Sequence, residues 1–256
     1  MQDKYRYLVV PARIGVITLA AILAACGTTT SPTGSFGMTA DQASVPGLAQ
    51  PADLLIDRWG VPHIYAASLY DAFVAQGYVA ARDRLWQMDL WRKRGLGQMA
   101  QDFGPAWVDS DQAARSVLFR GDMYREWLAY GSDAKRVAEA FVAGVNAFVV
   151  ETERNPAKLP MEFELMGYKP ARWAPEDTVR IRHHGLTLNF TSEVERAAAY
   201  CRGPEGVRAD ALRRETVPDT IAKVPEGLDT CAIDGTPLKR AYALATAGPR
   251  FTRDNT

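Results

Sequence analysis

The segment GYVAARDRLWQMDLWRKRGLGQMAQDFG at residues 77–104 decides how the first half of the chain is interpreted. Its apolar residues recur every three or four positions, which is the pattern of a helix with one apolar face. Just before it, Ser68 and Asp71 resemble a helix-capping box in which Asp replaces the usual Glu. We therefore predict a long helix over about residues 69–94, ended by Gly95.

The GLGQMA sequence at residues 95–100 is close to a dinucleotide-binding fingerprint. That fingerprint needs a strand before it and a helix that opens at it, whereas here the preceding residues have the helical period. The same segment carries charges at i, i+3 and i, i+4 spacing, such as Asp89 and Lys93. Paired carboxylates can perform acid–base chemistry, but charges on a helix more often pair with one another or face solvent. We interpret the segment as a structural helix.

The rest of the pattern predicts a mostly helical chain with a little sheet. Two short strands, at residues 54–56 and 63–65, are expected around a turn that contains Pro62. Further helices are expected at residues 111–130, 132–154, 175–188 and 193–201. From Arg202 onward the periodicity fades, so residues 202–256 are expected to form an irregular, spacer-like C-terminal segment.

The bulk composition excludes some classes of protein. The chain has 256 residues, 47% of them hydrophobic, so it can bury the core of one large domain or two small ones. Its 30 Lys and Arg residues balance 30 Asp and Glu residues. This balance, without a block of like charge, gives no indication of a nucleic-acid partner. Three cysteines are too few for a disulfide scaffold.

The N-terminus has the pattern of an exported bacterial lipoprotein. Positive residues precede the apolar run at residues 14–25, which is shorter than the roughly 20 residues that cross a bilayer. The run ends in Leu-Ala-Ala-Cys-Gly, which resembles a lipobox with Cys26 as the lipidated residue. An ordinary signal peptide with a chance cysteine is the alternative. We predict a lipoprotein signal peptide at residues 1–26 and a flexible Gly-, Ser-, Thr- and Pro-rich tether at residues 27–52.

Lipid on Cys26 would anchor the protein to the membrane on the periplasmic side of the cell envelope. Gly27 after the cysteine favours the outer membrane over the inner one. In an exported chain, Cys201 and Cys231 could pair or remain free thiols. Both possibilities stay open from the sequence.

Four motifs resemble those of penicillin acylases, in the same order. They are D-x-x-G-x-P-H-I-x-A at residues 57–66, G-Y-x-x-A-x-D-R-L-x-Q-M at residues 77–88, G-x-x-P-x-x-W-x-P-x-D at residues 167–177 and T-S-E at residues 191–193. The resemblance covers residues 53–201. It implies an α+β fold: the mostly helical α-chain portion of an αββα N-terminal-nucleophile hydrolase, incomplete without the β chain.

The resemblance also implies a reaction. In that family a precursor cleaves itself, and the freed N-terminal Ser of the β chain attacks an amide carbonyl with its own α-amino group as base. The substrates are acyl amides: the acyl side chains of β-lactam antibiotics or N-acyl-homoserine lactones. No segment similar to the family's G-S-N-N-W is present in this sequence. We therefore assign no catalytic residue here and expect the chain to be inactive alone, as a fragment, one half of a split gene or the product of a broken gene.

The resemblance points to four residues of a possible site. Glu193 would give one oxygen to a structural calcium whose other ligands come from the missing β chain; alternatively, it stabilises the start of its helix. Leu186, Leu188 and Phe190 would lie in the acyl pocket or, equally, in the core. A second interpretation of the whole chain is a noncatalytic lipoprotein, either a remnant or a binding module of the envelope.

Overall fold

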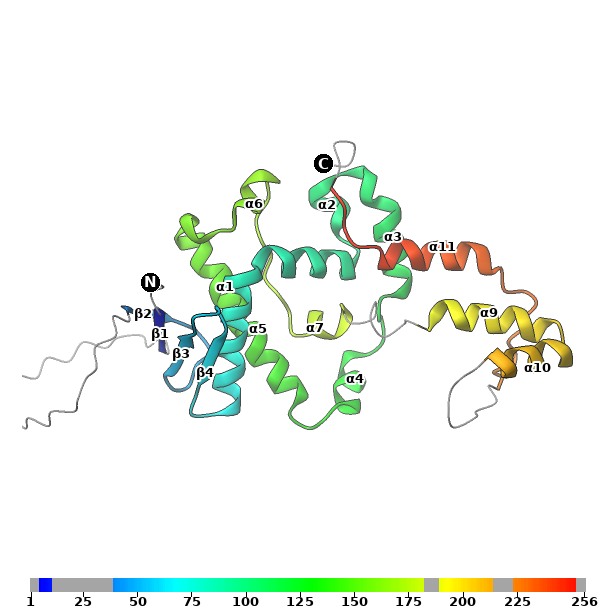
Figure 1. The fold of residues 1–256 in the computed structure, drawn as a ribbon, viewed down its shortest axis with the longest axis horizontal. Helices are drawn as coiled ribbons and strands as arrows, with labels where there is room; N and C mark the ends of the chain where they lie inside the picture. The colour runs from blue at the N-terminus through cyan, green and yellow to red at the C-terminus, as the bar shows by residue number, and fades with distance from the viewer. Residues whose placement is uncertain (1–4, 11–38, 182–188, 214–222, 252–256) are drawn as a thin grey trace, which may run out of the picture. The chain divides into compact units, whose positions relative to one another are not determined.

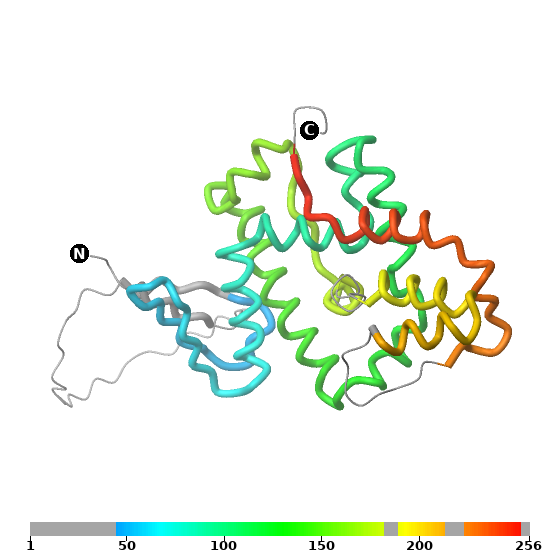
Figure 2. The backbone as a smooth tube through the Cα atoms, turned by 45° about the vertical axis from the view of Figure 1, so that its right-hand side comes forward, coloured from blue at the N-terminus to red at the C-terminus, as the bar shows by residue number. Residues whose placement is uncertain are grey.

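The computed structural model describes residues 5–10, 39–181, 189–213 and 223–251 (Figure 1). Within them the chain divides into two compact units. Unit 1 contains Met1–Trp86, Met123–Phe163 and Lys169–Pro175, and unit 2 contains Gln87–Asp122, Glu164–Tyr168 and Glu176–Thr256. Both views show that helices dominate (Figures 1 and 2), and Figure 1 shows the strands together near the N-terminus. Among the described residues, every helix is too short or too polar to span a bilayer.

The sheet of unit 1 has four strands in the order β2-β1-β3-β4. Its strands are β1 (Tyr5–Val10), β2 (Thr39–Ser44), β3 (Ala52–Ile56) and β4 (Pro62–Tyr65). β1 runs parallel to β2 and antiparallel to β3. β3 and β4 form the expected antiparallel pair, with Leu54 opposite Ile64. The predicted strand pair is confirmed, and two further strands come from the segments interpreted above as signal peptide and tether.

The turn between β3 and β4 is built around Asp57. Its Oδ1 accepts the backbone N–H groups of Trp59 at 2.8 Å and Val61 at 2.9 Å. The bond from Val61 is the largest cause that holds the pKa of Asp57 below its ordinary value. Gly60 adopts a φ of 81°, which favours glycine. Oδ2 of Asp57 lies 3.3 Å from Nε2 of His63. The first motif therefore folds this hairpin.

Packing in unit 1 begins within the segment that was predicted to be a flexible tether, residues 27–52, because Val45 and Leu48 are buried. The backbone N–H of Ala49 donates to Oδ1 of Asp71 at 2.7 Å. Half of the predicted capping box is present: the N–H of Asp71 donates to the Ser68 hydroxyl. In return, Oδ2 of Asp71 accepts the Ser68 hydroxyl and not the backbone N–H that a full capping box would use. The Asp71 carboxylate thus binds both the capping residue Ser68 and the segment that precedes the helix.

The predicted long helix is α1 (Leu69–Leu96), with a non-helical backbone at Arg84. In unit 1, α1 crosses α5 (Ala134–Arg154) at two glycines. A Cβ on Gly77 would lie 1.9 Å from the carbonyl oxygen of Phe141, and one on Gly144 would lie 1.9 Å from that of Val74. Only glycine permits so close an approach of two helix backbones.

Next to this crossing, the Tyr78 hydroxyl donates to Glu151 at 2.5 Å, and its ring packs edge-on against Phe148. The predicted stop at Gly95 is wrong by two residues. Gly95 lies inside α1, where a Cβ would come within 2.9 Å of Ile181. The residue with positive φ that follows the helix is Gly97, at 65°.

Two other helix predictions need correction. The single helix expected over residues 111–130 is α3 (Val108–Val117) and α4 (Met123–Ala129), because Leu118 has an extended backbone. The helix expected over residues 175–188 is described only as α7 (Asp177–Arg180), since residues 182–188 lie outside the described residues. The shorter elements are α2 (Met99–Phe103), η1 (Pro105–Trp107), η2 (Pro156–Lys158) and α6 (Met161–Leu165).

The expectation of an irregular C-terminal segment is wrong for its described part. After α9 (Phe190–Cys201), the chain forms α10 (Pro204–Arg213) and α11 (Gly235–Thr246). Pro204 is the first residue of α10, where its missing N–H costs nothing. Asp234 caps α11 by accepting the N–H of Thr236 at 3.0 Å. Gly203 and Pro204 thus lie at the start of α10 and Gly235 at the start of α11, whereas Pro225 and Gly227 lie in the non-helical segment between these helices.

Candidate functional site

Glu193 lies in the first turn of α9 and is bound by an arginine. Nη1 of Arg196, one turn further on, donates to both carboxylate oxygens of Glu193, at 2.6 and 2.7 Å. Nε of Arg196 donates to the buried Asp210 of α10 at 3.1 Å. Burial alone would lower the pKa of Arg196, but the hydrogen bonds and charges of the two carboxylates raise it above its ordinary value. One guanidinium is thus shared by two carboxylates and offsets the charge of only one of them.

These residues do not form a calcium site by themselves. Calcium binds six to eight oxygens, and in the described part of the chain no group of three or more His, Cys, Asp or Glu side chains could hold a metal ion. Glu193 lies where it can stabilise the start of α9, because an anion in the first turn of a helix interacts favourably with the helix dipole. Sequence reasoning missed Arg196, although the i, i+3 spacing from Glu193 was a usable signal.

A cavity of about 470 Å³ lies beside Glu193 in unit 2. Phe190, predicted to lie in the acyl pocket, is one of its lining residues. The ring of Phe190 also stacks on Tyr242 of α11, with centroids 4.9 Å apart. The structure therefore brings Phe190 and Glu193 to one cavity. Leu186 and Leu188 lie outside the described residues, as does Cys26.

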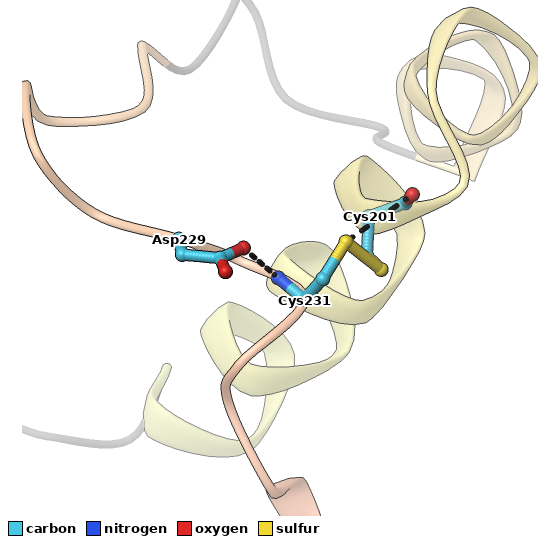
Figure 3. Close-up of a disulfide and its surroundings, with 3 residues drawn as sticks. All are labelled: Cys201, Asp229 and Cys231. Carbon is cyan, nitrogen blue, oxygen red and sulfur yellow. Dashed lines mark hydrogen bonds between the residues drawn. A yellow bond between two sulfur atoms is a disulfide. The ribbon is translucent and has the colours of Figure 1, made fainter.

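Cys201 and Cys231, which the sequence left either paired or free, form a disulfide (Figure 3). Cys201 is the last residue of α9, and Cys231 lies in the non-helical segment before α11. The backbone N–H of Cys231 donates to Oδ1 of Asp229 at 2.9 Å (Figure 3). The residues that precede the two cysteines, Tyr200 and Thr230, both line the cavity.

Two buried basic residues on the second half of α1, Arg92 and Lys93, are paired with carboxylates. Arg92 donates through Nε to Asp177 at 2.7 Å, and Lys93 donates to Asp102 at 2.5 Å. Burial and the nearby Asp89 raise the pKa of Tyr168 far above its ordinary value. These charges have structural partners, but Arg92 and Lys93 are buried and form their hydrogen bonds with Asp177 and Asp102, not with one another or with solvent as expected. The partners came from distant positions, which spacing along one helix could not reveal.

The family motifs mostly occupy such structural positions. Asp57 shapes a turn, Gly77 permits a helix crossing, and Asp177 neutralises a buried arginine. Trp173 is held by Asn146, which accepts its backbone N–H at 2.8 Å and donates to its carbonyl at 2.9 Å. Of the four motifs, T-S-E is the one that reaches the cavity, through Glu193.

Comparison with known proteins agrees with this architecture. A family model described as penicillin amidase matches residues 51–231. The penicillin acylase 2 proenzyme of Pseudomonas sp. (strain SE83) is 38% identical over 146 residues, covering 57% of this chain and 18% of that protein. Acyl-homoserine lactone acylase QuiP of Pseudomonas fluorescens (strain Pf0-1) is 33% identical over 179 residues, covering 69% and 20%.

A solved structure is similar as well. The thermostable penicillin G acylase from Alcaligenes faecalis matches with a TM-score of 0.52 and 27% identity, over 68% of this chain and 97% of that chain. These matches define a family of hydrolases that act on amide bonds. The chain belongs to the penicillin amidase family, as its four motifs predicted. It spans about a fifth of the length of the curated relatives named above.

Proposed function

We propose that this chain is the α portion of an amidohydrolase that cleaves linear acyl amides, either the side chains of β-lactam antibiotics or N-acyl-homoserine lactones. The observation that carries the proposal is the difference in coverage. The chain matches 97% of one solved acylase chain but only 18% of a related proenzyme. In this proposal a β portion supplies the nucleophile, its base and the groups that stabilise the oxyanion.

Exposed apolar residues support a need for a partner. Trp59 and Tyr65 at the β3–β4 hairpin are 76% and 59% exposed, and Tyr124 and Leu128 on α4 are 71% and 67% exposed. Large apolar side chains that are exposed in groups commonly mark an interaction surface. We expect the purified chain to self-associate when it is concentrated, unless a partner covers these side chains, so its unfolding is measured in dilute solution. A chain that stays monomeric at high concentration would argue against this.

The amidase proposal predicts a difference between the chain alone and the chain in a complete enzyme. The 256-residue chain alone should not hydrolyse phenylacetyl or long-chain acyl amides. A chimera in which residues 53–201 replace the matching segment of the Pseudomonas penicillin acylase 2 proenzyme should cleave itself and hydrolyse them. Hydrolysis is measured by release of the amine. Turnover by the chain alone, or a soluble chimera that stays uncleaved, would contradict the proposal.

We propose a bound calcium ion only for the complete enzyme. There Glu193 would give up its bonds to Arg196 and bind the calcium ion instead. For the chain alone we predict that calcium and a chelator give the same melting temperature. The Arg196→Gln variant should melt at a lower temperature with or without calcium, because Glu193 and Asp210 lose their counter-ion and two carboxylates alone do not supply the oxygens that calcium needs. Thermal unfolding followed by circular dichroism measures both. Calcium stabilisation of the unmodified chain by several degrees would show that Arg196 does not occupy this site.

We also propose that the protein is anchored through lipid on Cys26 to the periplasmic face of the cell envelope, at the outer membrane. The disulfide supports export, because disulfides form and persist in oxidising compartments. Mass spectrometry of the N-terminal peptide from bacterial membranes should find Cys26 as the first residue with a diacylglycerol attached. Changing Cys26→Ser should release the protein from the membrane fraction, and retention of this variant would count against a lipid anchor.

A further inference from the structure

Strand β1 lies in a segment that the proposed export would remove. It is an inner strand of the sheet, between β2 and β3 (Figure 1). Cleavage before Cys26, as proposed above, takes residues 1–25 away from the domain. In the described part of the chain, β1 is the one strand that pairs with β2. Its loss would therefore leave β2 without a partner strand and uncover one edge of β3.

The uncovered edge belongs to a buried strand. Residues 52–55 of β3 pair with β1, and among them Ala52 and Leu54 are 1% and 0% exposed. Backbone N–H and C=O groups that lose their partners in such a place cost free energy. An open sheet edge also favours pairing with another chain. A strand that fills the place of β1 would remove both problems.

β2 already has the direction and the register that this place requires. It runs parallel to β1, and β1 runs antiparallel to β3, so β2 is antiparallel to β3. Arg6 of β1 pairs with Ala40 on one side and with Leu55 on the other. A sideways shift by one strand spacing, about 4.8 Å, would therefore place Ala40 opposite Leu55. Because nothing slides along the strand, each residue of β2 keeps its face of the sheet.

The chain connection also favours β2 over a strand from another molecule. Residues 45–51 join β2 to β3, so the shift would produce an antiparallel hairpin that continues into the β3–β4 pair. The connection itself is held by the helices. A Cβ on Gly47 would lie 3.1 Å from Ala143 of α5, and the N–H of Ala49 donates to Asp71 of α1. Only residues 39–44 move, and a strand of the same chain has a high effective concentration.

Residue types explain why β1 holds this place while it is present. The sequence of β1, YRYLVV, is rich in aromatic and β-branched residues, which favour strands. The sequence of β2, TADQAS, contains alanine and aspartate, which are depleted in strands. β2 is thus the weaker strand, and it pairs with β3 only when β1 is gone.

We propose that loss of residues 1–25 makes β2 move into the place of β1, so that the processed domain has a sheet of β2, β3 and β4. The occurrence of this strand exchange in cells rests on the proposed processing at Cys26. The exchange itself rests on the strand register of unit 1 alone. It assigns residues 39–44, which were predicted to be part of the tether, to the folded domain of the exported protein.

The test uses pairs of cysteines in the full chain, which carries Cys26→Ser and a site for a sequence-specific protease in place of residues 28–34. Positions 40 and 55 lie about 10 Å apart across β1, too far for a disulfide, and become direct neighbours after the exchange. In the chain with Ala40→Cys and Leu55→Cys, cleavage and removal of the N-terminal fragment should raise the disulfide yield by about tenfold or more. Mass spectrometry of the unreduced peptides measures the yield, and circular dichroism checks that the helices persist.

Two control pairs define the starting arrangement. Leu55→Cys with His63→Cys joins the directly paired strands β3 and β4, so its disulfide should form before and after cleavage. Arg6→Cys with Ala40→Cys joins β1 to β2 and should hold the N-terminal fragment on the domain after cleavage.

Three results would overturn the exchange. One is a cut chain in which positions 55 and 63 form a disulfide but positions 40 and 55 do not. Another is an equal yield for positions 40 and 55 before and after cleavage, because β1 would then not separate them. A third is a disulfide-linked dimer of the cut chain with Leu55→Cys alone, which would show that a second copy occupies the edge.

Failure of this inference is distinguishable from failure of the proposed anchoring, because the added protease acts independently of the cell. If cells leave Cys26 without lipid but the cut chain forms the disulfide between positions 40 and 55, only the anchoring is refuted. If Cys26 carries lipid in cells and the cut chain does not form this disulfide, only the strand exchange is refuted.

Discussion

Replacing Gly144 with alanine should lower the free energy of unfolding of unit 1 by about 3 kcal/mol, at the upper end of the usual cost of overpacking. The new Cβ would lie 1.9 Å from the carbonyl oxygen of Val74 and 2.6 Å from the backbone nitrogen of Tyr78. Both are backbone atoms of α1, so no side chain can rotate away. The intrinsic helix preference of alanine recovers only about 1 kcal/mol.

Urea unfolding followed by circular dichroism measures this effect. Gly77→Ala should behave alike, because its Cβ would meet the Phe141 carbonyl at the same crossing. Gly131→Ala is the matched control, since its Cβ would have one ordinary contact, with Asp133 at 3.5 Å. We expect it to change stability by less than about 1 kcal/mol. If Gly144→Ala were as stable as the unchanged protein, α1 and α5 could not cross at these glycines.

The second large effect is expected for Asp177→Ala, which should destabilise unit 2 by about 3–5 kcal/mol. The carboxylate accepts Nε of Arg92 at 2.7 Å, and the side chains are only 5% and 10% exposed. Its removal takes this counter-charge away from a buried guanidinium, which is costly because water cannot replace it there. The result does not require that the intact pair be strongly stabilising, because desolvation offsets most of the attraction.

A double-mutant cycle separates these contributions. Arg92→Met combined with Asp177→Ala should cost less than the sum of the single changes, since no buried charge of the pair remains. The exposed Arg172–Glu153 pair has the same 2.7 Å separation, with side chains 48% and 50% exposed. Breaking it with Glu153→Ala should cost less than about 1 kcal/mol. Equal costs for the exposed and buried pairs would contradict the burial of Arg92.

Sequence reasoning succeeded where one element carries its own signal. Periodicity located α1 and α5, and the turn residues around Pro62 located the β3–β4 hairpin. Sequence reasoning failed where the structure of an element depends on contacts with residues elsewhere in the chain. Gly95 is a glycine because Ile181 packs against it, and this contact is not visible along α1 itself. The helix end at Gly97 was therefore assigned to the wrong glycine.

The site was predictable to a similar extent. The family motif placed Glu193, but the nature of its partner depends on Arg196 and on Asp210 from another helix. Pairing of Cys201 with Cys231 depends on how α10 returns the chain, which neither composition nor spacing determines. The described cavity likewise joins α9 to a non-helical segment, and pattern reasoning had no means of bringing these two together.

The hairpin turn at Asp57 has a wider implication for how such proteins are found in genomes. Asp57, Gly60 and His63 preserve a bend in the backbone and touch no reacting group in the described part of the chain. A descendant protein that no longer cleaves amides but keeps the same fold would still need these three residues to form the hairpin. Sequence searches that rely on the motif at residues 57–66 would therefore retrieve active enzymes together with relatives that have lost amide hydrolysis.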